Sequence, residues 1–268
     1  MKSKALLVGI NQYPNPRNSL RGCVNDILDM EHFIAVQNKV YPPDQIKKLT
    51  NKDATKKGIL RQLEWLLEDA ESGDQLLFHY SGHGAQLPCK KSEEKDGLDE
   101  IICPYDYDGT DFTTIRDNEF SKLFKYIPKG VHFIWISDSC HSEDLSREPF
   151  VANSEYDTYY RNFGIYNRKQ NLEAAERFGN LPSSSIAPNN LQGALLSACA
   201  SHQLSADAYI ENRFNGAFTH YLIKNLNKYA AKMPIEKIIQ LVNKDLEANG
   251  YDQNPCTEGL LENKLFFL

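Results

Sequence analysis

The sequence lacks the features that mark membrane, nucleic-acid-binding and disulfide-rich proteins. No run approaches the roughly 18 apolar residues of a membrane-spanning helix, and the opening segment is too short and too quickly polar for a secretory signal. Basic residues are the minority, with 30 Lys and Arg against 36 Asp and Glu, so no excess of positive charge favours nucleic acid. The sequence also has no CxxC motif and no internal repeat. We therefore expect a cytoplasmic protein that binds neither nucleic acid nor membrane.

What is present is the composition of a globular chain, with 41% hydrophobic and 25% charged residues. A chain of 268 residues suits one large α/β domain and can bury a core without disulfides. Its six cysteines form no close pair, so we expect reduced thiols. Free thiols raise the question of whether one of them is a nucleophile.

Apolar runs alternate with helical periodicity along the chain. Continuous apolar runs are typical of strands buried on both faces of a parallel sheet. The expected strands are residues 5–10, 75–80, 131–137, 193–198 and 265–268. Apolar residues at helical spacing predict helices within 24–33, 59–67, 218–226 and 235–246. This order predicts a single α/β domain, and the polar stretch between residues 143 and 190 predicts a surface loop or a processing segment.

Polar residues follow two of the predicted strands. His83 stands between glycines after the strand at 75–80, and Cys140 follows the strand at 131–137. Taken alone, such a histidine is typical of a turn, and such a cysteine is typical of a small buried side chain. If the strands are parallel neighbours, their carboxyl ends bring both residues to one edge. Because a thiol needs a base to attack a carbonyl, the pair predicts a Cys-His dyad for acyl transfer.

Spacing also predicts acidic side chains beside this dyad. Residues two apart on a strand point to the same side, so Asp138 shares a side with Cys140, and Ser81 with the histidine. On a helix, Cys23 and Asp26 project from one face. Two carboxylates beside a nucleophile favour a Lys or Arg side chain of the substrate.

The motifs Tyr-Ser-Gly-His-Gly at 80–84 and Asp-Ser-Cys-His-Ser at 138–142 resemble those of metacaspases and their prokaryotic relatives, the orthocaspases. These are caspase-like cysteine peptidases, and the similarity covers nearly the whole chain. Animal caspases have Gln-Ala-Cys at the nucleophile instead. The resemblance implies a caspase-like fold, a mostly parallel central sheet flanked by helices. It also implies that His83 is the general base or acid, that Cys140 is the nucleophile, and that the N–H groups of Gly84 and Cys140 form the oxyanion hole.

The resemblance further implies an endopeptidase that cleaves protein or peptide substrates after Arg or Lys through an acyl-enzyme. Its specificity pocket corresponds to Cys23, Asp26, Ser81 and Asp138. No cofactor is required for the chemistry, but calcium is implied as an activator, because hard oxygen ligands suit this ion. The calcium candidates are Asp99, Asp117, Asn118 and Asp144. Asn118 stands where the family has an acidic residue, and a solvated acidic surface is the alternative.

By the same resemblance, residues 146–190 are a linker between a large-subunit-like part, 1–145, and a small-subunit-like part, 191–268. We expect a zymogen that cleaves itself in this linker. The basic candidates are Arg147, Arg161, Arg168, Lys169 and Arg177, of which Arg168, Lys169 and Arg177 are preferred. We expect a monomer with no prodomain and no C-terminal extension, regulated by calcium, by the linker or by a separate partner.

Two other functions remain open. A catalytically silent caspase-fold scaffold would bind a partner protein without cleaving it, but the retained His83 and Cys140 count against this reading. A related peptidase could cleave after another residue, such as Asn, but the two carboxylates, Asp26 and Asp138, favour a basic residue.

Overall fold

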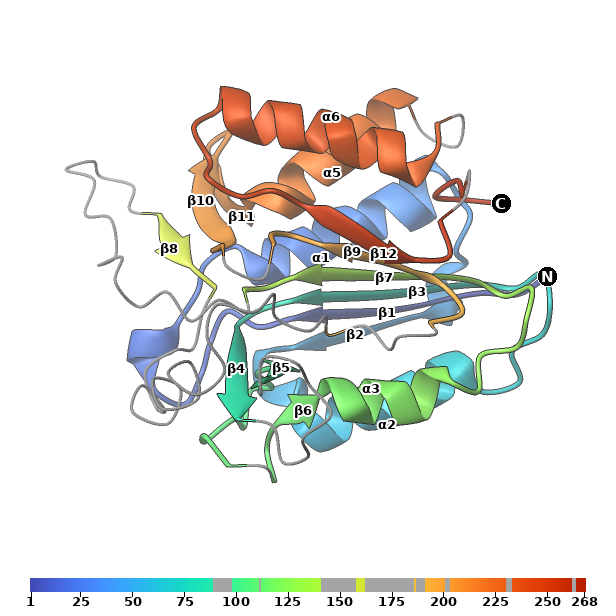
Figure 1. Cartoon of the computed structure of the whole chain (residues 1–268), viewed down its shortest axis with the longest axis horizontal. Helices are drawn as coiled ribbons and strands as arrows, with labels where there is room; N and C mark the ends of the chain where they lie inside the picture. The colour runs from blue at the N-terminus through green and yellow to red at the C-terminus, as the bar shows by residue number, and fades with distance from the viewer. Residues whose placement is uncertain are drawn as a thin grey trace.

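A six-stranded sheet forms the centre of the molecule, with the strand order β12-β9-β7-β3-β1-β2 (Figure 1). This computed structural model describes residues 1–88, 98–110, 112–140, 158–161, 186, 191–200, 203–229, 233–261 and 264–268. The strands of the central sheet are β1 (Ser3–Gly9), β2 (Ile46–Thr50), β3 (Gln75–Ser81), β7 (His132–Asp138), β9 (Ala194–Ser197) and β12 (Cys256–Gly259). β12 runs antiparallel to β9, and the other neighbours are parallel.

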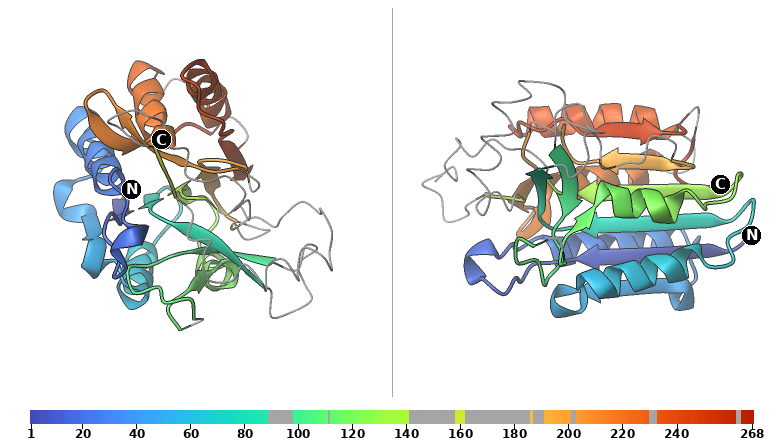
Figure 2. Two further views of the ribbon diagram at one scale, coloured as in Figure 1. Left: turned by 90° about the vertical axis from the view of Figure 1, so that its left-hand side faces the viewer. Right: turned by 60° about the horizontal axis from the view of Figure 1, so that its bottom comes forward.

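Helices cover both faces of this sheet (Figures 1 and 2). On one face lie α1 (Cys23–Glu31), its continuation as a π-helix (His32–Gln37), α5 (Ala217–Tyr229) and α6 (Ile235–Ala248). On the other lie α2 (Lys56–Leu67) and α3 (Asp117–Phe124). Two hydrophobic cores result, one on each side. This explains why β3 and β7 are buried along their whole length and are mostly apolar.

Local sequence sets where the helices begin. The Thr55 side chain accepts a hydrogen bond from the N–H of Gly58 and so caps α2. Ile59, Leu63 and Leu66 then recur at helical spacing and face the core. No helix in the part of the chain that the structure describes is long and apolar enough to cross a membrane.

Two small antiparallel sheets lie at the end toward which the central parallel strands point (Figure 1). One contains β4 (Gly84–Pro88), β5 (Leu98–Ile102) and β6 (Ile115–Arg116). The other contains β8 (Tyr159–Tyr160), β10 (Ala206–Ile210) and β11 (Arg213–Gly216). Short 3-10 turns occupy Pro16–Asn18, Pro43–Gln45 and Asn51–Asp53.

The predicted α/β class, four of the five strands and the four helical regions are confirmed. The strand predicted at residues 265–268 is wrong. Phe266 and Phe267 are buried, but they pack on Phe33 with ring centroids 5.8 and 5.5 Å away and form no strand. The edge position belongs to β12, whose half-exposed residues carry no apolar pattern. Strand β2 and helix α3 were not predicted.

Candidate active site

The two polar motifs meet because β3 and β7 are parallel neighbours in register, with Ser81 opposite Asp138. His83 and Cys140 each follow two residues later. The backbone carbonyl oxygen of Arg161 accepts hydrogen bonds from the N–H of Gly84, at 3.0 Å, and from the N–H of Cys140, at 3.2 Å. The two motifs therefore converge on one carbonyl group.

The His83 ring is buried and neutral. Its Nε2 atom lies 2.8 Å from the carbonyl oxygen of Asn18. Because a carbonyl oxygen can only accept, Nε2 carries the proton of the neutral ring, and Nδ1 carries the lone pair. Burial lowers the pKa of His83 to about 4, and the hydrogen bond with the backbone of Asn18 opposes this shift. The ring is therefore neutral near pH 7.

The Cys140 thiol is enclosed. Its Sγ atom accepts a hydrogen bond from the N–H of Ser205, at 2.7 Å, and the side chain is fully buried. The carbonyl oxygen of Ser205 in turn accepts from the N–H of Arg161, at 3.1 Å. Ser205 thus contacts both the Cys140 thiol and the backbone of Arg161.

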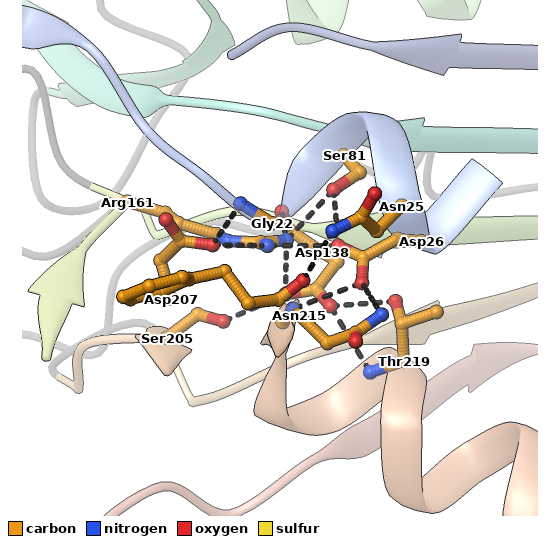
Figure 3. Close-up of polar contacts among 12 residues, drawn as sticks. Gly22, Asn25, Asp26, Ser81, Asp138, Arg161, Ser205, Asp207, Asn215 and Thr219 are labelled. Carbon is orange, nitrogen blue, oxygen red and sulfur yellow. Dashed lines mark hydrogen bonds and ion pairs between the residues drawn. The ribbon is translucent and has the colours of Figure 1, made fainter. Parts of the chain in front are cut away.

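The side chain of Arg161 enters an acidic pocket, defined here as Asp26, Ser81, Asp138 and Asp207 (Figure 3). Its Nη2 atom lies 2.7 Å from Asp26 and 3.0 Å from Asp207. Its Nη1 atom lies 3.1 Å from Asp138 and donates to the Ser81 hydroxyl at 2.7 Å. Three carboxylates therefore surround one guanidinium and bind it through charge-assisted hydrogen bonds. Burial raises the pKa of Asp138 and of Asp207, and the guanidinium opposes this.

Each carboxylate is held in place by other donors. Asp138 accepts from the Thr219 hydroxyl at 2.6 Å and from its N–H at 3.0 Å. Asp26 accepts from the N–H of Gly216 at 2.9 Å, and Asp207 accepts from the N–H of Gly22 at 2.9 Å. These donors fix the three carboxylates around the Arg161 guanidinium.

The structure brings together most of the pocket predicted from sequence. Asp26, Ser81 and Asp138 contact the guanidinium directly. Cys23 is fully buried at the start of α1, and burial raises the pKa of its thiol, while the nearby Arg161 guanidinium opposes this. The sequence argument missed Asp207. The feature of the sequence that could have indicated Asp207 is its position as the single carboxylate in the otherwise apolar strand β10.

Arg161, one of the basic candidates in the linker, lies in the acidic pocket, a position that the sequence does not predict. The preferred cleavage residues Arg168, Lys169 and Arg177 lie outside the described residues, as does Arg147.

The calcium candidates lie on β5 and at the start of α3. The Oδ2 atom of Asp99 lies 2.5 Å from the Arg116 guanidinium, and its buried Oδ1 has no hydrogen-bond partner among the described residues. Asp117 is buried and accepts from the N–H of Asn118, whose side chain is exposed. Asp144 lies outside the described residues. Within the described ranges no three His, Cys, Asp or Glu side chains cluster as metal ligands.

Fold and site together define a class of protein. A mostly parallel sheet flanked by helices carries a cysteine and a histidine at neighbouring strand ends, which is the caspase-like arrangement, and in this chain an acidic pocket lies beside them. A crystal structure of a Geobacter sulfurreducens protein has this fold, with a TM-score of 0.70 at 23% identity, over 98% of this chain and 95% of that one.

The sequence comparisons give the family. The model described as "Metacaspase, peptidase C14 domain" matches residues 3–148. Metacaspase-9 of Arabidopsis thaliana is 30% identical over 95% of this chain and 93% of its own length. Metacaspase-1 of Coccidioides immitis is 31% identical over 100% of this chain and 64% of its own length, and Metacaspase-1 of Debaryomyces hansenii is 30% identical over 95% of this chain and 64% of its own length. The chain belongs to the metacaspase family, and it spans less than two thirds of these two fungal relatives.

Proposed function

We propose that the chain is a cysteine endopeptidase that cleaves peptide bonds after Arg and, more slowly, after Lys. The observation that carries this proposal is the position of Arg161. Its carbonyl oxygen takes the place of a scissile carbonyl between the N–H groups of Gly84 and Cys140, while its guanidinium fills the acidic pocket. Arg is favoured over Lys because only the planar guanidinium reaches several carboxylates at once.

We propose the following chemistry for this arrangement. His83 takes the thiol proton of Cys140, and the thiolate attacks the carbonyl carbon. The two N–H groups stabilise the negative oxygen that forms. The intermediate collapses as His83 gives the proton to the departing amine, which leaves an acyl-enzyme on the sulfur. A water molecule, deprotonated by the same histidine, then attacks the thioester and releases the new carboxyl terminus.

The same geometry supports autoprocessing in the 146–190 linker. The bond that follows Arg161, which joins it to Asn162, is the bond that the site would cleave. Until then the segment 158–161 covers the thiol, which is the arrangement of a zymogen. Cleavage after Arg168, Lys169 or Arg177 stays a separate prediction.

Reporter hydrolysis tests the proposal. Short peptides that end in Arg, Lys, Asp or Asn are offered to the wild type and to Cys140→Ala, with and without calcium. We expect cleavage after Arg above Lys in the wild type and none in the variant. Preference for Asp or Asn would overturn the role of the acidic pocket. Cleavage of none of the four would favour the silent scaffold.

We also propose calcium as an activator, bound with the help of Asp99. The support is the buried Oδ1 atom of Asp99, which has no hydrogen-bond partner among the described residues. A carboxylate oxygen is a hard ligand of the kind that calcium prefers. Thermal unfolding of the Cys140→Ala chain tests this without any turnover. Calcium should raise the melting temperature, and Asp99→Asn should abolish the rise, with Asp44→Asn on the exposed surface as control. Equal rises in the Asp99→Asn variant and its parent would contradict the site.

A further inference from the structure

We infer that Phe214 forms a subsite for an aromatic side chain located two residues before the cleaved basic residue. The subsite, called here the Phe214 platform, consists of Phe214, Tyr209 and Arg21. The inference rests on the proposed function, because it treats the segment 158–161 as a bound substrate.

Backbone pairing fixes the position of each residue of this segment. Strand β8 runs antiparallel to β10, with Tyr160 opposite Ala206 and Tyr159 opposite Asp207. The N–H of Arg161 donates to the carbonyl oxygen of Ser205, which continues the same ladder. A substrate that adds to β10 in this way has one register only, set by its basic residue in the acidic pocket.

Tyr159 lies on the same side of the strand as Arg161, since residues two apart point to one face. Its ring meets that of Phe214 edge to face, with centroids 6.4 Å apart and planes at 62°. This is a favourable geometry for two aromatic rings, because the positive edge of one faces the negative face of the other.

The platform is held by contacts of its own. The Phe214 ring packs against Tyr209 at 5.2 Å, and the Arg21 guanidinium lies 3.8 Å from its centroid. The backbone N–H of Arg21 also donates to Asp207 in the acidic pocket. One short segment of chain thus supports both subsites, so their spacing is fixed. Tyr159 stays 37% exposed, so the platform covers one part of the ring and accepts Phe, Tyr or Trp.

Three reporter peptides distinguish binding at the Phe214 platform from binding of the neighbouring substrate residues: Tyr-Tyr-Arg, Ala-Tyr-Arg and Tyr-Ala-Arg. The hydrolysis of each is measured with the processed enzyme. We expect kcat/KM for Ala-Tyr-Arg to fall about three- to tenfold below that for Tyr-Tyr-Arg, the range of an aromatic pair. The Tyr-Ala-Arg reporter keeps the platform contact and should fall less.

Variants tie the effect to the platform. Phe214→Leu keeps an apolar side chain and should bring the ratio of Tyr-Tyr-Arg to Ala-Tyr-Arg close to one. Arg21→Gln keeps the backbone contact with Asp207 and should lower the ratio partly, which gives a second test if Phe214→Leu does not fold. Tyr126→Leu, at a residue 75% exposed and on another surface, should leave the ratio unchanged.

The outcomes distinguish the two proposals. If the Arg reporters are cleaved but Tyr-Tyr-Arg and Ala-Tyr-Arg have equal kcat/KM, the Phe214 platform is overturned and the peptidase stands. If no Arg reporter is cleaved, the proposed function fails and the platform fails with it.

Discussion

Replacing Arg161 with Gln removes the cation that three buried carboxylates share in the acidic pocket. The Arg161 side chain and its partners Asp26, Asp138 and Asp207 are each 0% exposed. Removing one partner of a buried ion pair costs about 3–5 kcal/mol, because the remaining charge stays buried and unpaired. If segment 158–161 leaves the pocket, water enters and hydrates the carboxylates. The loss of stability in the variant cannot then exceed the free energy of this local opening. We therefore expect the free energy of unfolding to fall by about 3 kcal/mol.

Urea unfolding measures this loss in the Cys140→Ala background, where self-cleavage does not interfere. Arg161→Lys should lose less than Arg161→Gln, because the ammonium keeps the charge but cannot contact several carboxylates in one plane. Arg61→Gln is the control, since Arg61 is exposed on α2 and should change stability by no more than about 0.5 kcal/mol.

With Cys140 intact, mass spectrometry follows cleavage after residue 161. We expect cleavage with Arg, slower cleavage with Lys and none with Gln. An Arg161→Gln chain that unfolds like its parent and is still cut after residue 161 would refute the reasoning that the guanidinium is bound as a substrate side chain.

Three further predictions concern the pocket and its surroundings. Asp207→Asn should lower kcat/KM for Arg reporters at least tenfold, because it removes one charge-assisted contact of about 1.5–3 kcal/mol. An unchanged kcat/KM would show that Asp207 only supports the backbone of Arg21 and does not bind the substrate. Gly216→Ala should reduce Arg cleavage further, since a Cβ there would come within 2.3 Å of the Asp138 carboxylate, and a variant as active as wild type would contradict that packing. Stability should fall as pH drops from about 6.5 to 4, because the pKa of three buried histidines is lowered to about 4 and the unfolded chain binds more protons in that window. These are His79, His83 and His132. Each histidine lowers the free energy of unfolding by up to about 1.4 kcal/mol per pH unit in this window, and the raised pKa of Asp138 opposes the loss. The free energy of unfolding of His132→Gln should therefore fall less steeply with decreasing pH than that of the wild type.

The parts of the site that could be predicted are those that follow strong strands. The apolar runs of β3 and β7 placed His83 and Cys140 at one edge, and the alternation of side chains placed Ser81 and Asp138 with them. Helical spacing likewise placed Asp26. These inferences needed periodicity, the rule that parallel strands end together, and the assumption that the two strands are neighbours, which the structure confirms.

The missed parts depend on contacts between segments without periodicity. Asp207 reaches the pocket because β10 packs beside the start of α1, which no local pattern encodes. Strand β8 has only two residues, too few for an alternation to show. The linker contains several basic residues in similar polar surroundings, so the sequence could not single out Arg161. The position of Arg161 in the acidic pocket depends on contacts of its backbone and its side chain together.

Cleavage after Arg161 does not by itself remove this residue from the acidic pocket. Arg161 stays joined to Cys140 through about twenty intervening residues, and a tether of this length holds the new chain end at an effective concentration in the millimolar range. A substrate must therefore compete with the tethered Arg161 even after processing, which raises its apparent KM. Arg161→Gln removes the competitor, so we expect this variant to hydrolyse Tyr-Tyr-Arg without processing and with a lower KM than processed wild type. Equal KM values for the two enzymes would show that the new carboxyl terminus leaves the pocket once the bond is cut.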